Sequence, residues 1–127
     1  MYDKLLAIDG LLDIEETLLH IIDRMSWIKT ADDFAATPQG VDMLDVATIR
    51  LMAIGEEIKK IEKRTNGQLL VQYPNIDWKE IMGMRNFIAH EYFRVDAKVI
   101  FNTVKNKIQP LLTTIQQMIA DLEKSKS

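Results

Sequence analysis

Apolar residues recur along this chain at alternating spacings of three and four, and no other feature constrains its fold as strongly. Residues three or four apart lie on the same side of an α-helix, so the pattern predicts amphipathic helices. Glycine and proline, which weaken helices, number only 5 and 3 in 127 residues. The pattern is followed by Leu11, Ile14, Leu18, Ile21, Met25 and Ile28, by Leu44, Ala47, Leu51, Ile54, Ile58 and Ile61, and by Ile108, Leu111, Ile115, Met118 and Leu122.

The breaks between these stripes indicate where the second helix begins and ends. Thr37 can cap its N-terminus, with Pro38 at the first helical position. Gly67 can adopt the left-handed conformation that closes a helix. We expect residues 68–76 to form a loop after it.

Two aspartates mark the starts of the later helices. Asp77 and Asp96 can each accept a hydrogen bond from a first helical turn, and Glu80 completes a capping-box spacing after Asp77. Pro110 lies inside the last helix and should kink it, because proline removes one backbone hydrogen bond. We therefore expect an all-α fold in a single domain over residues 1–127. It would be an antiparallel four-helix-type bundle whose C-terminal helix is kinked at Pro110.

Composition and charge exclude several classes of site. The chain has no cysteine, which excludes a disulfide scaffold and thiolate metal sites. Its net charge of −3 disfavours broad, non-specific binding to a polyanion, although a compact site acting on one phosphodiester needs only a few cations. The N-terminus lacks the pattern of a signal peptide, and no apolar stretch approaches the ~20 residues that span a bilayer. We therefore expect a cytoplasmic protein with no membrane association.

A compact set of chemically active side chains lies in the helix predicted after Asp77. Arg85, His90 and Tyr92 fall within eight residues. At about 100° per residue, Arg85 and Tyr92 share an otherwise apolar face, and His90 lies about 140° from Arg85. Arg85 and His90 can therefore meet only if the helix distorts, if the arginine reaches round it, or if a second copy of the chain supplies the partner. A symmetric dimer along this helix would bring two copies of the set into one cleft.

Such a cleft could cleave RNA without a metal. A histidine can take the proton of the attacking 2′-hydroxyl or protonate the leaving oxygen. An arginine can stabilise charge on the phosphate oxygens, and a tyrosine can donate a hydrogen bond or stack on a base. Gly83, on the His90 side, is costly in a helix, so we expect something to approach the backbone there.

Each of these residues also has a purely structural interpretation. A salt bridge from Arg85 to Glu56 or Glu57 would be a sufficient reason for the arginine. Packing with a polar tip would be a sufficient reason for Tyr92. The other histidine, His20, lies at the edge of the first stripe, where a surface or core-edge role is expected.

The segment from Trp78 to Asp96 resembles the signature of the HEPN superfamily, specifically the HepT-like toxins. Their motif, Arg followed after four residues by His and then by x-Tyr, corresponds to Arg85, His90 and Tyr92. The flanks Trp-x-x-Ile-x-Gly-Met and Tyr-Phe-x-Val-Asp are also similar. The Ile54-Gly55-Glu56-Glu57 segment resembles the family's second helix.

This resemblance implies a HEPN-like domain, usually dimeric, with the paired motifs facing each other. The implied activity is a metal-independent endoribonuclease toxin of a type VII-like toxin–antitoxin system, without a cofactor, that cleaves RNA by 2′-hydroxyl attack. Arg85 and His90 would be catalytic, and Tyr92 and Asn86 would support them, Asn86 by orienting His90 or binding phosphate. The implied partner is a minimal nucleotidyltransferase antitoxin, as in HepT/MntA pairs, that transfers AMP to Tyr92.

Two other functions are compatible with the same residues. The chain could be a non-catalytic accessory subunit that helps a small nucleotidyltransferase hold its substrate. It could also be a helical scaffold in which Arg85 pairs with Glu56 for stability alone.

Overall fold

The computed structural model describes residues 2–125, apart from the side chain of Tyr92, and within this range it contains helices and no strand. The prediction of an all-α fold is therefore confirmed. In chain order the elements are α1 (Lys4–Arg24), α2 (Asp33–Ala36), α3 (Pro38–Arg64), the 3-10 turn η1 (Leu70–Gln72), α4 (Trp78–His90), the 3-10 turn η2 (Tyr92–Arg94), α5 (Ala97–Asn106) and α6 (Ile108–Lys124).

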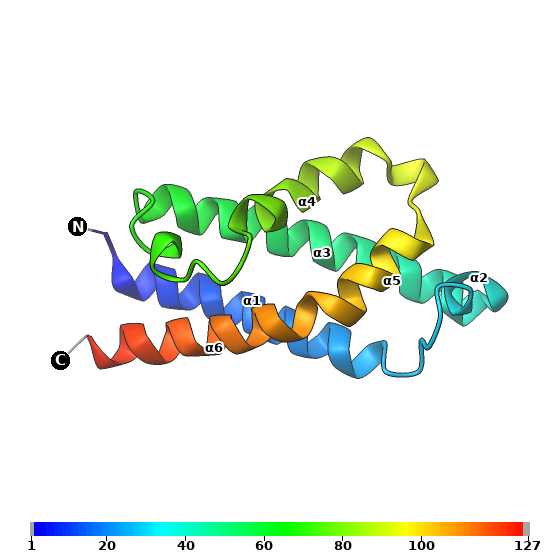
Figure 1. The fold of residues 1–127 in the computed structure, drawn as a ribbon, viewed down its shortest axis with the longest axis horizontal. Helices are drawn as coiled ribbons and strands as arrows, with labels where there is room; N and C mark the ends of the chain where they lie inside the picture. Colours follow the sequence, from blue (N-terminus) through cyan, green and yellow to red (C-terminus); the bar gives the residue numbers. More distant parts are fainter. Residues whose placement is uncertain (1, 126–127) are drawn as a thin grey trace.

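The long helices form an antiparallel bundle. In Figure 1, α3 runs back along α1, α6 also runs opposite to α1, and α4 lies along α3 in the opposite direction. The α4–η2–α5 segment forms a hairpin at one side, and α6 continues from α5 towards the end at which α1 begins. None of the helices in residues 2–125 is long and apolar enough to cross a membrane.

The apolar stripes form the core, as the sequence predicts. Every member of the first and third stripes is buried, and in the second stripe only Leu44 is half-buried. Burial of a large aliphatic side chain contributes about 1.5–3 kcal/mol, so these contacts dominate the stability of the bundle. The helical period in the sequence therefore identified the residues that hold the helices together.

The predicted caps form at the expected helix starts. Thr37 Oγ1 accepts a hydrogen bond from Gly40 N at 3.0 Å, and Asp96 accepts one from Lys98 N at 2.8 Å. Gly67 has a φ of +72° and follows α3, as the sequence predicts. These local bonds satisfy backbone groups that a helix end otherwise leaves without a partner.

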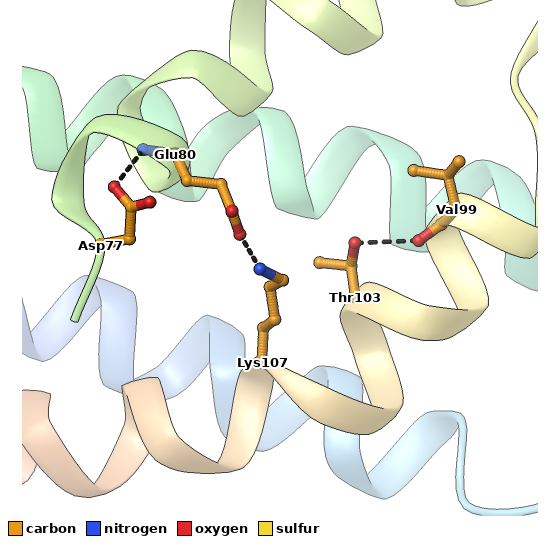
Figure 2. A network of polar contacts seen from close by, with 5 residues as sticks. All are labelled: Asp77, Glu80, Val99, Thr103 and Lys107. Carbon is orange, nitrogen blue, oxygen red and sulfur yellow. Dashed lines mark hydrogen bonds and ion pairs between the residues drawn. The ribbon is translucent and has the colours of Figure 1, made fainter. Parts of the chain in front are cut away.

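The start of α4 departs from the expected capping box. Asp77 accepts a hydrogen bond from Glu80 N at 3.1 Å, so half of the arrangement is present. The Glu80 carboxylate does not complete it and instead pairs with Lys107, between α5 and α6, as Figure 2 shows. The Glu80–Lys107 ion pair therefore connects the first turn of α4 to the junction of α5 and α6.

The expected kink at Pro110 appears as a break one turn earlier. α5 ends at Asn106 and α6 begins at Ile108, so Pro110 occupies the first turn of α6. The first backbone N–H groups of a helix have no intrahelical acceptor, and a proline there removes no hydrogen bond. The chain accommodates the proline by starting a new helix, and Figure 1 shows the change of direction between α5 and α6.

The predicted loop 68–76 is more ordered than the sequence suggests. It contains η1 and is anchored to α6, since Tyr73 Oη donates to Asp121 Oδ2 at 2.6 Å. Burial of the Tyr73 phenol, followed by its bond to Asp121, raises the pKa of Tyr73 to about 12. The same hydrogen bond lowers the pKa of Asp121. Trp78 Nε1 also donates to Tyr73 O at 2.8 Å, so the loop holds the beginning of α4 in place.

A glycine sets the distance between α3 and α4. A Cβ atom on Gly55 would lie only 2.8 Å from Ile81 O and 3.2 Å from Arg85 N. Only glycine allows the two helix backbones to approach this closely at that point. Gly55 therefore places Arg85 against α3, which is where the geometry of the candidate site begins.

Candidate functional site

Arg85 lies on the apolar face of α4, but the residue is exposed. Its side chain is 51% exposed, and Nε lies 3.6 Å from Glu56 Oε2 on α3. The carboxylate partner required by a guanidinium on an apolar face is therefore Glu56 rather than Glu57. Exposed ion pairs of this kind contribute only about 0.2–1 kcal/mol, and a guanidinium carries five donors, so Arg85 retains the capacity to bind an anion.

Asn86 lies beside Arg85. Its Oδ1 accepts a hydrogen bond from Arg85 Nη1 at 3.2 Å. The amide therefore contacts the guanidinium, and the roles expected for Asn86, orienting His90 or binding phosphate, stay predictions.

His90 is the last residue of α4 and is exposed. Within the described part of the chain, its imidazole makes no hydrogen bond or ion pair. α4 is an uninterrupted α-helix from Trp78 to His90, so no break in the helix turns His90 towards Arg85. One copy of the chain keeps the two side chains on different faces of the helix.

Tyr92 begins η2, immediately beyond α4. Its side chain lies outside the described residues, so its predicted supporting role and its modification by AMP remain predictions. His20, the other histidine, is half-buried on α1, in accord with the core-edge role expected for it. Among residues 2–125, no group of His, Cys, Asp or Glu side chains is arranged to hold a metal ion.

Two hollows follow the seam between α4 and α5. One of about 320 Å³ lies near η2, and one of about 440 Å³ extends towards Lys107. Both are lined by Phe87 and Val99, whose side chains are 57% and 39% exposed. Phe87 was not among the residues predicted for the site. Its position could have indicated it, because it lies on α4 opposite the buried Trp78 and Ile81, where a polar residue is expected.

Gly83 lines the hollow nearer Lys107. A Cβ atom there would meet nothing within 4 Å, so the chain itself does not make the close approach expected at this glycine. A separate hollow of about 610 Å³, lined by Trp27 and Met43, lies between α1 and α3 and includes none of the predicted site residues.

Comparison with known proteins identifies the chain's relatives. A candidate RNase of Methanocaldococcus jannaschii is 40% identical over 78 residues, which cover 61% of this chain and 64% of the relative. Another candidate RNase of that organism is 30% identical over 114 residues, covering 89% of this chain and 87% of the relative. A candidate RNase of Caldanaerobacter subterraneus subsp. tengcongensis is 31% identical over 100 residues, covering 78% and 81%.

The chain spans less than two thirds of the first of these relatives, at 64% of its length. No solved structure matches the chain. The family model described as "Ribonuclease HepT-like" matches residues 16–118, which include the whole of α3, α4 and α5 and the candidate site residues. The chain belongs to the ribonuclease HepT-like family.

Proposed function

We propose that this chain is a metal-independent endoribonuclease whose site is composed of residues from two copies. The observation that carries the proposal is the position of His90: it is exposed, makes no polar contact within the described residues, and lies on a different face of unbroken α4 from Arg85. A two-fold dimer along α4 would bring the Arg85 of one copy to the His90 of the other. Gly83, open on the same side as His90, provides room for that second helix.

The proposed reaction uses these two side chains on one phosphodiester. The RNA 2′-oxygen attacks phosphorus while His90 takes its proton or protonates the leaving 5′-oxygen. The bond from phosphorus to the 5′-oxygen breaks, leaving a 2′,3′-cyclic phosphate and a free 5′-hydroxyl. Arg85 binds the non-bridging oxygens, whose charge grows in the transition state, and Asn86 holds its guanidinium in position.

The first test is RNA cleavage by the purified chain in EDTA. Wild-type protein should leave 2′,3′-cyclic phosphate ends. His90→Ala should lower the rate by about 10²–10⁴-fold, and Arg85→Ala should remove about 2–4 kcal/mol of transition-state stabilisation. His20→Ala is the matched control and should cut normally. A chain that leaves diverse RNAs intact would contradict the proposal.

A mixing experiment tests whether the site is composite. The Arg85→Ala and His90→Ala variants are each inactive alone in this proposal, but a mixed dimer has one site with both residues intact. Mixing should therefore restore cleavage after subunit exchange. If mixing restores nothing while the wild type cuts RNA, the two residues act within one copy.

We further propose that a small nucleotidyltransferase regulates this toxin by transferring AMP to Tyr92. Co-expression of the chain with such a partner should add the mass of AMP to the intact protein and suppress cleavage. Tyr92→Phe should prevent the addition. A stable complex that forms without the added mass, with an uncut RNA substrate, would instead favour the accessory-subunit function.

A further inference from the structure

The hollow near η2 has the features of a small-ligand site. It lies where the end of α4, η2 and the start of α5 meet, and its volume is about 320 Å³. Ile88 and Ile100, both buried, give it an apolar floor. Pockets of this size with an apolar lining and a few polar groups are typical of sites for small planar ligands.

An exposed aromatic ring forms part of the wall. Phe87 lines the hollow with its side chain 57% exposed, and Val99 lies opposite on α5 with its side chain 39% exposed. Phe87 and Val99 together form an exposed apolar surface beside the hollow, and such surfaces can mark ligand-binding grooves. A phenylalanine ring suits a nucleobase, because unstacked bases in single-stranded RNA stack on aromatic side chains.

Charged residues stand at the rim of the hollow. Glu91 and Arg94 line it, and their side chains make no hydrogen bond or ion pair within the described part of the chain. Asp96, also on the rim, uses its Oδ1 to accept a hydrogen bond from Lys98 N at 2.8 Å. Glu91 therefore offers two free acceptor oxygens, and Arg94 offers a cation at the mouth of the hollow.

A carboxylate with both oxygens free discriminates among the four RNA bases. Guanine presents two adjacent donors, N1–H and the N2 amino group, which match the two oxygens of a carboxylate. Adenine, cytosine and uracil each place an acceptor beside their donor on the same edge, and that acceptor would face a negative charge. Glu91 therefore favours guanine, and Arg94 is suited to the phosphate attached to it.

We infer that this hollow binds one guanine base of the RNA strand. The inference rests on the proposed function for the identity of the ligand. Phe87 and His90 are three residues apart on α4 and so are neighbours on its surface. A base stacked on Phe87 would therefore lie next to His90, and the hollow would select a nucleotide next to the phosphodiester that is cut.

Binding of mononucleotides tests the inference without any cleavage. Titration calorimetry with GMP, AMP, CMP and UMP should show that wild-type protein binds GMP about tenfold or more tightly than the others. Glu91→Gln should remove this preference, whereas Glu16→Gln, an exposed carboxylate of α1, should retain it. Arg94→Gln should weaken all four nucleotides by a similar factor.

Inosine monophosphate tests the same inference on the wild-type protein, without any substitution. Inosine monophosphate lacks the N2 amino group, so wild-type protein should bind it less tightly than GMP. Equal affinity for the four nucleotides, no binding at all, or an unchanged preference in Glu91→Gln would overturn the inference.

Cleavage assays separate this inference from the proposed function. RNAs that differ in one base beside the cut should be cleaved fastest with guanine there, and Glu91→Gln should lower cleavage beside guanine towards the rate found with the other three bases. If GMP binds selectively but no RNA is cut, the proposed nuclease function is wrong and the guanine-binding inference is supported. If RNA is cut without base preference and GMP does not bind, the guanine-binding inference is wrong and the nuclease function is supported.

Discussion

The two halves of α4 differ in how they use their side chains. In the first half, Trp78 and Ile81 are buried, the Trp78 indole donates to the preceding loop, and Glu80 pairs with Lys107. In the second half, Phe87 is 57% exposed and His90 has no polar contact among the residues that the structure describes. The first half is anchored within the chain, whereas the second half leaves Phe87 and His90 exposed.

This difference explains how a short helix can carry a site. A catalytic side chain needs a rigid backbone beneath it and free polar atoms at its tip. The cap, the loop contacts and the close approach at Gly55 fix the α4 backbone, so the exposed side chains of Phe87 and His90 are not needed for stability. Each of the following predictions tests this division between the anchored and the presented half.

The largest expected effect compares the two aromatic residues of α4. Trp78→Ala should lower the free energy of unfolding by about 3–5 kcal/mol, because it empties a buried site and removes a hydrogen bond. Phe87→Ala should change it by less than about 1 kcal/mol, because that ring is exposed. Urea unfolding followed by circular dichroism measures both. A large loss for Phe87→Ala that depends on protein concentration would show that a second copy covers the ring.

Two glycines on the facing helices provide the next comparison. Gly55→Ala should destabilise the chain by about 1–3 kcal/mol, since its Cβ would press on Ile81 O and separate α3 from α4. Gly83→Ala should stabilise the isolated chain by up to about 1 kcal/mol, because its Cβ would enter open space in a helix.

Thermal unfolding of the two variants at low protein concentration checks these signs. A Gly83→Ala chain that is more stable but no longer dimerises or cuts RNA would place the second copy against the face of α4 that carries Gly83 and His90. Equal effects at the two glycines would contradict the geometry at the crossing of α3 and α4.

The smallest expected effect concerns pH and the loop that anchors α4. The folded pKa of Asp121 is lowered, so its contribution to stability is present above pH 3.8 and is lost as the pH falls through the folded pKa. The pKa of Tyr73 is raised from 10.0 to about 12, so its contribution is present below pH 10 and is lost as the pH rises towards 12.

Tyr73→Phe should therefore flatten the loss of stability in both pH windows. Gln117→Ala removes the other hydrogen bond to Asp121. This variant should reduce the loss of stability at acid pH and leave the loss at alkaline pH unchanged. Unfolding midpoints measured from pH 2.5 to 11.5 test this pair of variants. A Tyr73→Phe profile identical to that of the wild type would show that the loop does not depend on this bond.

Much of the fold could be predicted because local chemistry determines it. The period of the apolar residues identified the core, and Thr37, Asp77 and Asp96 cap the helices that they were expected to cap. A kink was expected at Pro110, but the structure has a break between two helices before it. The sequence does not show whether a proline lies in the first turn of a helix or in its interior.

The residues of the candidate site remain a prediction, and the sequence anticipated only part of the contacts that they make. The spacing of Arg85 and His90 placed them on different faces of a straight helix, and α4 is unbroken between them. The choice of Glu56 as the partner of Arg85, and the contact of Asn86 with Arg85, depend on how α3 and α4 cross. A crossing point set by Gly55 is a long-range property that no local pattern specifies.

The sequence by itself determined most of the helices, their buried faces and the family motif, because helical period and capping act between residues a few positions apart. Only the tertiary structure decided which groups remain free. Glu80 is taken up by Lys107, whereas Glu91 and Arg94 at the other end of α4 are left at the rim of a hollow. The physical reason is that burial and pairing depend on which distant elements meet: Lys107, between α5 and α6, reaches Glu80, whereas no side chain of the described residues reaches Glu91 or Arg94.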